Sequence, residues 1–166
     1  MDEWTGLRIA VVVVAWVTVL GGLTLAVTWL VAGGSRAYGP EDELMAKAGV
    51  DVEHGPRPVA AFSSAQVGIH GLLGIMTAAL VTYAAARADD RPTGYLAGIV
   101  AIAVTATPGI MMFRKWRSAR RPVVPGRTAS ARGPKVEDRL PRAVVYGHGL
   151  AATTTAVLLI ILLLVE

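Results

Sequence analysis

Long apolar stretches alternate with polar segments along this chain. Four stretches contain no charged side chain, and each is at or above the roughly 20 residues that cross a bilayer as a helix. They cover residues 9–35, 58–86, 92–113 and 143–165. This pattern predicts four transmembrane helices, at about residues 9–33, 60–86, 93–113 and 143–165.

The composition agrees with a membrane protein. The 166 residues are 54% hydrophobic and only 17% charged, which fits a polytopic membrane protein better than a soluble domain. The segment MDEWTGLR before the first apolar stretch is acidic rather than basic, so we expect this stretch to be retained rather than cleaved as a secretory signal. The expected fold is an all-α integral membrane protein. Residues 1–166 would form one membrane domain, an up-and-down bundle of four transmembrane helices.

Positive charge is unevenly divided between the two sides of the expected bundle. The loops at residues 34–59 and 114–142 share one side and hold 13 Lys and Arg residues, whereas the other side holds 3. Because cytoplasmic loops retain positive charge, we expect both loops in the cytoplasm and the N- and C-termini outside. The Ala, Val, Arg and Gly usage resembles that of a high-GC bacterium, so the expected location is a bacterial plasma (inner) membrane.

The two long loops predict different contacts. Residues 114–142 are basic and rich in Pro, Gly, Ser and Ala, so we expect a largely disordered loop or one lying on anionic lipid. The same charges are already required by topology, which argues against a nucleic-acid partner. The first loop is net acidic, and one short interfacial helix is expected from about Glu41 to Ala48. The short link after residue 86 predicts that the second and third helices are antiparallel neighbours.

Two of the three histidines lie in similar apolar segments. Aligning His70 with His148, 78 residues later, places HGLLGIMTAAL over HGLAATTTAVL, with six of eleven positions identical. The repeat predicts two helical hairpins related by an axis along the membrane normal, so the second and fourth helices would run parallel. Both histidines lie roughly 26 Å from the outer ends of their helices and are therefore level with each other.

This placement suggests a flat cofactor between the two histidines. Diagonal helices of such a bundle are about 11 to 14 Å apart, which we expect to be too wide for the imidazoles to touch. A b-type haem fits this spacing, because two neutral imidazoles can ligate its iron axially without a covalent link to Cys, and the chain has no Cys. The predicted iron ligands are therefore His70 and His148.

Neighbouring residues would complete this cofactor site. Glycines beside the histidines would leave room for the edge of the macrocycle, and we expect this of Gly71, Gly74 and Gly149, together with Gly68 and Gly147. Gln66, one turn before His70, and Tyr146, beside His148, could donate or accept the hydrogen bonds that orient the imidazoles.

Three functions follow from these observations. Two histidines within four helices resemble, in outline, the small haem-bearing anchors and cytochrome b-like subunits of respiratory enzymes, which implies electron transfer. The alternative is a non-enzymatic accessory or scaffold protein that packs against a larger membrane complex or a second copy of itself. A small transporter is the third, disfavoured because the spans contain no Asp or Glu. Two histidines are too few for a catalytic zinc site, and no catalytic constellation is visible, so enzymatic activity stays open.

Overall fold

The computed structural model describes residues 4–37, 47–49, 59–87, 91–119 and 135–165. Four long helices make up most of this part of the chain, and all four are long and apolar enough to cross a membrane. They are α1 (Thr5–Val31), α3 (Ser64–Ala86), α4 (Arg91–Ala119) and α5 (Arg142–Val165). The predicted all-α bundle of four helices is therefore confirmed.

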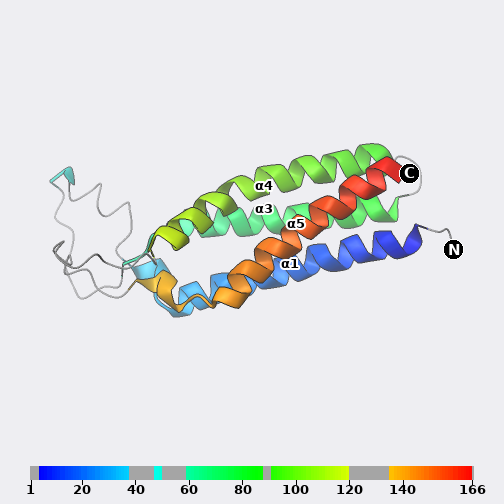
Figure 1. The fold of residues 1–166 in the computed structure, drawn as a ribbon. Coiled ribbons are helices and arrows are strands. Elements are labelled where there is room, and N and C mark those ends of the chain that lie inside the picture. Colours follow the sequence, from blue (N-terminus) through cyan, green and yellow to red (C-terminus); the bar gives the residue numbers. More distant parts are fainter. Residues whose placement is uncertain (1–3, 38–46, 50–58, 88–90, 120–134, 166) are drawn as a thin grey trace.

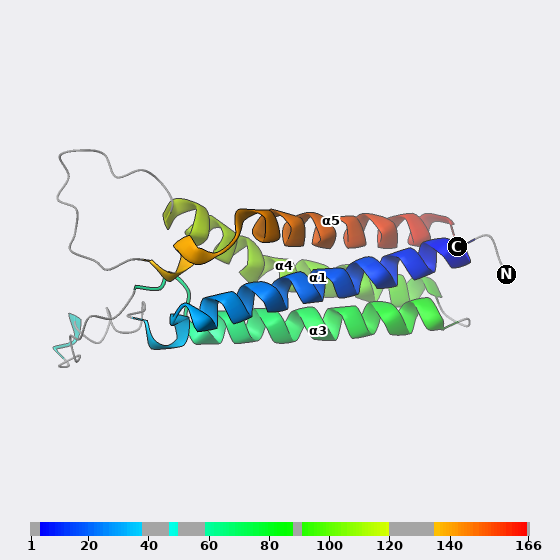
Figure 2. The ribbon, with the colours of Figure 1, turned by 90° about the horizontal axis from the view of Figure 1, so that it is seen from below.

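The helices form an elongated up-and-down bundle (Figures 1 and 2). Both termini lie at one end, called here the terminal end, and the long connections lie at the other, the loop end (Figure 1). Helix α1 packs against α3 and α5, and α4 packs against the same two helices. Helices α3 and α5 thus stand at opposite corners, and both run from the loop end to the terminal end (Figure 1), as the repeat predicted.

The helix boundaries depart from the apolar stretches for local reasons. Helix α3 begins four residues later than expected because Ser63 and Gln66 form a capping box, each side chain bonding the other residue's main-chain N–H. Helix α4 runs six residues beyond the apolar stretch, to Ala119. Helical hydrogen bonding does not depend on apolar side chains, so charged residues can continue a helix past the hydrocarbon region. The close contact of Gly94 with Ala84 confirms that α3 and α4 are neighbours.

Two groups of buried side chains hold the bundle together. The terminal-end core consists of Val11, Ala15, Ala78, Val81, Ala84, Tyr95, Leu159 and Leu162. The loop-end core consists of Trp29, Ala60, Phe62, Trp116, Val136 and Leu140. Most large apolar residues outside these cores are exposed, as expected of helices that face lipid.

A buried carboxylate joins three segments at the loop end. Glu137, in the short 3-10 helix η2 (Val136–Arg139), is fully buried. Its Oε1 accepts hydrogen bonds from Trp29 Nε1, at 3.3 Å, and from the Ala61 main-chain N–H, at 2.8 Å. The Val136 N–H donates to the Val59 carbonyl at 3.0 Å. The segment before α5 is thereby attached to the end of α1 and to the segment before α3.

Replacing Gly34 with alanine is expected to destabilise the loop end. Gly34 begins the 3-10 helix η1 (Gly34–Arg36) and lies against the Trp29 indole, so a Cβ atom at this position would overlap the ring. The ring is buried and cannot move freely, so we expect Gly34→Ala to lower the free energy of unfolding by about 1–3 kcal/mol, measured in detergent. In the control Gly68→Ala, the new Cβ would meet nothing within 4 Å. An equal loss in both variants would contradict this account.

Two loop predictions lie outside the described residues. The short helix expected from about Glu41 to Ala48 falls almost entirely there, as does the central part of the basic loop, residues 120–134. The described parts of the basic loop are the last turns of α4 and the segment 135–141, which contains η2.

Candidate functional site

His70 and His148 lie between the two cores, and each bonds to the main chain of a neighbouring helix. His70 Nδ1, on α3, is 3.1 Å from the Thr105 carbonyl oxygen on α4. His148 Nδ1, on α5, is 2.9 Å from the Thr18 carbonyl oxygen on α1. A carbonyl oxygen can only accept, so the hydrogen must be on Nδ1 in both rings. In a neutral imidazole this leaves the lone pair on Nε2.

The two rings are direct neighbours. Their centroids are 6.1 Å apart and their planes are nearly perpendicular, at 85°. The expectation that helices at opposite corners would keep the imidazoles from touching is therefore wrong. Spacing between helix axes ignores the reach of the side chains, and both histidines extend across the bundle interior toward the helix that supplies their carbonyl acceptor.

The two helices that supply the carbonyl acceptors, α1 and α4, also resemble each other in sequence. Each histidine bonds to a helix of the other hairpin, so the two bonds are equivalent under the repeat. Three residue types recur in α1 and α4 at a common separation of 87 residues: Thr18, Gly22 and Trp29 correspond to Thr105, Gly109 and Trp116. Both tryptophans are buried in the loop-end core. Sequence reasoning missed this second repeat, although its Thr, Gly and Trp spacing is visible in the chain.

Two glycines in the repeat lie against the imidazoles. A Cβ atom at Gly109 would be 2.8 Å from His70 Cε1, and one at Gly22 would be 3.1 Å from His148 Cε1. Gly21 also faces His148, because a Cβ atom at this position would be 3.5 Å from the Cβ of His148. A side chain at any of these positions would press on a ring. Because glycine has no side chain, it leaves the space through which each histidine reaches its carbonyl acceptor.

The glycines expected to flank a cofactor are not packed against another helix. A Cβ atom at Gly68, Gly71, Gly74, Gly147 or Gly149 would meet nothing within 4 Å. All except Gly74 are exposed on the surface of the bundle. The structure thus brings the two predicted histidines together, but no other helix packs closely against the predicted glycines.

Gln66 and Tyr146 have partners other than the histidines. The Gln66 side-chain oxygen accepts from the Ser63 N–H within the capping box, at 3.2 Å, and from Lys115 Nζ, at 3.1 Å. Tyr146 is more than half exposed, and its ring lies 5.9 Å from Phe113 and 5.7 Å from Trp116. The role of orienting the imidazoles, expected of Gln66 and Tyr146, belongs instead to the carbonyls of Thr105 and Thr18.

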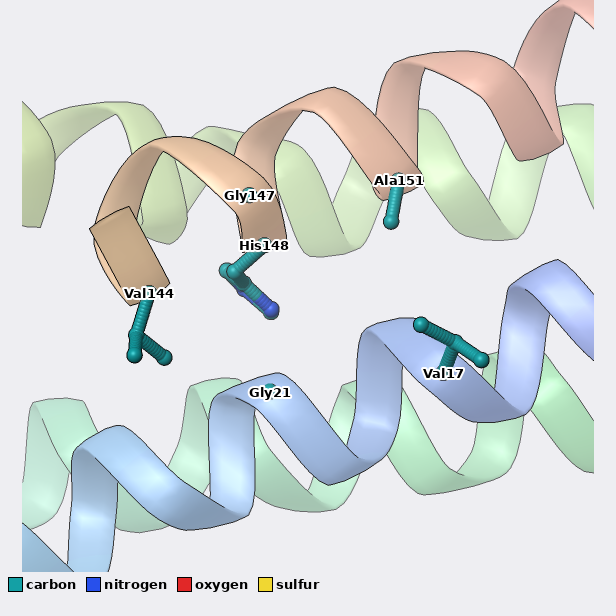
Figure 3. A pocket seen from close by; sticks show the side chains of 6 residues that line it. All are labelled: Val17, Gly21, Val144, Gly147, His148 and Ala151. Atoms are coloured by element: carbon teal, nitrogen blue, oxygen red, sulfur yellow. The ribbon is translucent and has the colours of Figure 1, made fainter.

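His148 also borders an apolar groove between α1 and α5 (Figure 3). The groove has a volume of about 230 Å³ and is otherwise lined by Val17, Gly21, Val144, Gly147 and Ala151. Around His70, the positions equivalent to Gly21, Gly147 and Ala151 hold the bulkier residues Pro108, Ile69 and Leu73. The two halves of the site therefore differ in the size of the side chains at equivalent positions.

The site contains two imidazole nitrogens that could bind a metal ion. Within the described residues, no group of three or more His, Cys, Asp or Glu side chains is close enough to hold a metal ion by itself.

The Thr105 hydroxyl is hydrogen-bonded to that of Thr77, at 2.9 Å, so a second contact between α3 and α4 supports the His70 side of the site.

The fold and this pair of histidines define the class: a bundle of four candidate membrane-spanning helices with two inward-facing imidazoles. Comparison with models of known protein families, with curated proteins and with solved structures finds no match to the chain. The function is therefore argued from the chemistry of the site.

Proposed function

We propose that this protein binds one b-type haem through His70 and His148 and carries electrons as a small cytochrome b-like membrane subunit. The observation that carries the proposal is the short distance from Nδ1 of each ring to a main-chain carbonyl oxygen. Each Nδ1–H is held by a main-chain carbonyl, which leaves each Nε2 as a lone-pair donor. Histidines that ligate metals almost always donate their other N–H to a carbonyl, carboxylate or water, because this bond fixes the ring and raises its basicity.

The separation of the rings supports ligation of a single ion. Imidazole nitrogens bind transition metals at about 2.0–2.1 Å, so two rings on opposite sides of one ion have centroids roughly 6 Å apart. The centroids of His70 and His148 are 6.1 Å apart. The separation of the two rings is therefore close to that of two imidazoles bound to one metal ion.

The small number of protein ligands favours haem over a bare ion. Structural zinc sites use four protein ligands and catalytic ones three, whereas the described residues offer two. A porphyrin supplies four further nitrogens, so two axial imidazoles complete an octahedral iron. Because the chain contains no Cys, thioether attachment is excluded and the haem would be of the b type.

Electron transfer is the activity that this ligand set favours. When bound, haem supplies a one-electron iron couple. With one histidine on each side of the iron, no coordination position would stay open for a substrate. Both histidines are half-buried, and their rings face each other inside the bundle.

We further propose that the loop end faces the cytoplasm of a bacterial plasma membrane and contacts anionic lipid. Seven described Arg and Lys residues flank the spans at this end: Arg36, Arg114, Lys115, Arg117, Lys135, Arg139 and Arg142. The terminal end has Arg8, Arg87 and Arg91. This asymmetry supports the orientation through the retention of positive loops in the cytoplasm.

The direct test is a dithionite-reduced minus oxidised visible spectrum of the detergent-purified protein, expressed with ample haem supply. We expect a sharp α band at a b-type position and about one haem per chain, because the two axial ligands define one site. A flat spectrum from folded, helical protein would contradict the proposal. The accessory or scaffold function would then be preferred, and copurifying membrane proteins would be identified next.

A further inference from the structure

We infer that Gly22 and Gly109 are positioning residues of the histidine pair. The imidazole of His70 is held rigidly, whereas that of His148 can shift. The inference rests on the proposed function for its cofactor, but the geometry of the imidazoles can be measured without haem.

The helix geometry explains why glycine is needed four residues after each threonine. In an α-helix, the carbonyl of residue i bonds to the N–H of residue i+4, so residue i+4 lies beside that carbonyl. Gly22 is four residues after Thr18, and Gly109 is four residues after Thr105. A side chain at either glycine would stand where the imidazole that reaches this oxygen now lies. Without it, each imidazole Nδ1–H reaches the oxygen, at 2.9 Å in α1 and 3.1 Å in α4.

The contacts are tighter at Gly109 than at Gly22. A Cβ atom at Gly109 would be 2.8 Å from His70 Cε1 and 3.4 Å from its Nε2. At Gly22, the nearest ring atom of His148 would be 3.1 Å away and its Nε2 would be 3.9 Å away. An alanine at position 109 therefore has to displace the ring, whereas one at position 22 requires a smaller shift.

The surroundings reinforce this difference. The groove bordered by Gly21, Gly147 and Ala151 lies beside His148 and gives its ring room to move (Figure 3). On the His70 side, the equivalent residues Pro108, Ile69 and Leu73 are bulkier. A disturbance of equal size should therefore break the hydrogen bond of His70 and only displace that of His148.

The test uses the full chain labelled with [15N]histidine in lipid nanodiscs, without added haem. The 15N chemical shifts separate protonated from unprotonated imidazole nitrogens, and the single variants His54→Gln, His70→Gln and His148→Gln assign the signals. We expect two rings protonated at Nδ1 in the unaltered protein. Gly109→Ala should lose this state for His70 alone, and Gly22→Ala should retain it for His148 with a shifted resonance.

Matched controls lie next to the same histidines. In Gly71→Ala and Gly149→Ala the new Cβ meets no atom of another helix within 4 Å, and successive side chains of a helix point in different directions, so both rings should keep their signals. Alanine is the better helix former, so loss of helix propensity cannot explain an effect of Gly109→Ala. In haem titrations, Gly109→Ala should weaken binding by about 10-fold or more, as loss of a metal ligand's orienting partner typically does.

The outcomes separate the inference from the proposed function. An unchanged His70 tautomer in folded Gly109→Ala protein, or equal effects in the two controls, would overturn the inference. An effect at Gly22 larger than that at Gly109 would overturn its second part. If the tautomers respond as expected but no variant binds haem, the positioning role stands and the haem proposal fails.

Discussion

His148→Asn protein is expected to fold and insert normally but to purify without haem. The asparagine side-chain amide can replace imidazole Nδ1–H as the donor to the Thr18 carbonyl, so the contact between the hairpins is retained. It has no counterpart of the Nε2 lone pair. His70→Asn should behave in the same way toward the Thr105 carbonyl. We expect haem per chain, measured as the pyridine haemochrome, to fall more than about 10-fold in either variant, since each removes one of the two proposed iron ligands.

The control for this experiment is His54→Asn, which removes the histidine outside the repeat and should keep its haem. Normal haem content in both asparagine variants would refute ligation by this pair. Substitution with leucine gives a second comparison, because it removes the donor as well as the ligand. If the histidines only link the two hairpins, the leucine variants would have a lower free energy of unfolding. The asparagine variants would then match the unaltered protein in both stability and haem content.

Glu137→Ala is expected to cause a large loss of stability at the loop end. The carboxylate is fully buried and accepts from the Trp29 indole and the Ala61 main chain. Its removal leaves two buried donors without their acceptor, at a cost of about 1–3 kcal/mol each. We therefore expect the free energy of unfolding in detergent to fall by roughly 3 kcal/mol, with the near-ultraviolet signal of the tryptophans changing as well.

Glu137→Gln tests whether the acceptor is responsible. Glutamine keeps a side-chain oxygen in nearly the same place, so the bonds from Trp29 and Ala61 can persist. Its stability should therefore stay close to that of the unaltered protein. Losses of similar size in both variants would show that the negative charge, rather than the two hydrogen bonds, is what the loop end needs.

The fold was largely predictable from the chain. A helix in lipid must satisfy its own main-chain groups, so the length and polarity of a segment are enough to indicate a span. The boundaries were less accurate because they depend on polar details. The Ser63 and Gln66 spacing is a recognisable capping box, and it would have moved the start of α3 to Ser64. The charged end of α4 carries no such signal, since its helix continues past the apolar stretch.

The site was predicted only in part. His70 and His148 stand out because ionisable residues are rare in apolar spans, and their repeat placed them at one level. Their acceptors are main-chain carbonyls, which leave no side-chain signature. The glycines that contact the rings, Gly22 and Gly109, belong to a repeat of 87 residues rather than 78, so the histidine alignment does not find them.

The sequence by itself determined the number of helices, their alternating direction and the shared level of the two histidines. The tertiary structure alone decided that the rings lie 6.1 Å apart, that each bonds across to the other hairpin, and which glycines face them. The physical reason is the rotation of each helix about its axis. In lipid, the outside of a helix is as apolar as the core, so hydrophobic periodicity does not reveal that rotation. Close packing of small residues sets it, and this becomes visible only when all four helices are assembled.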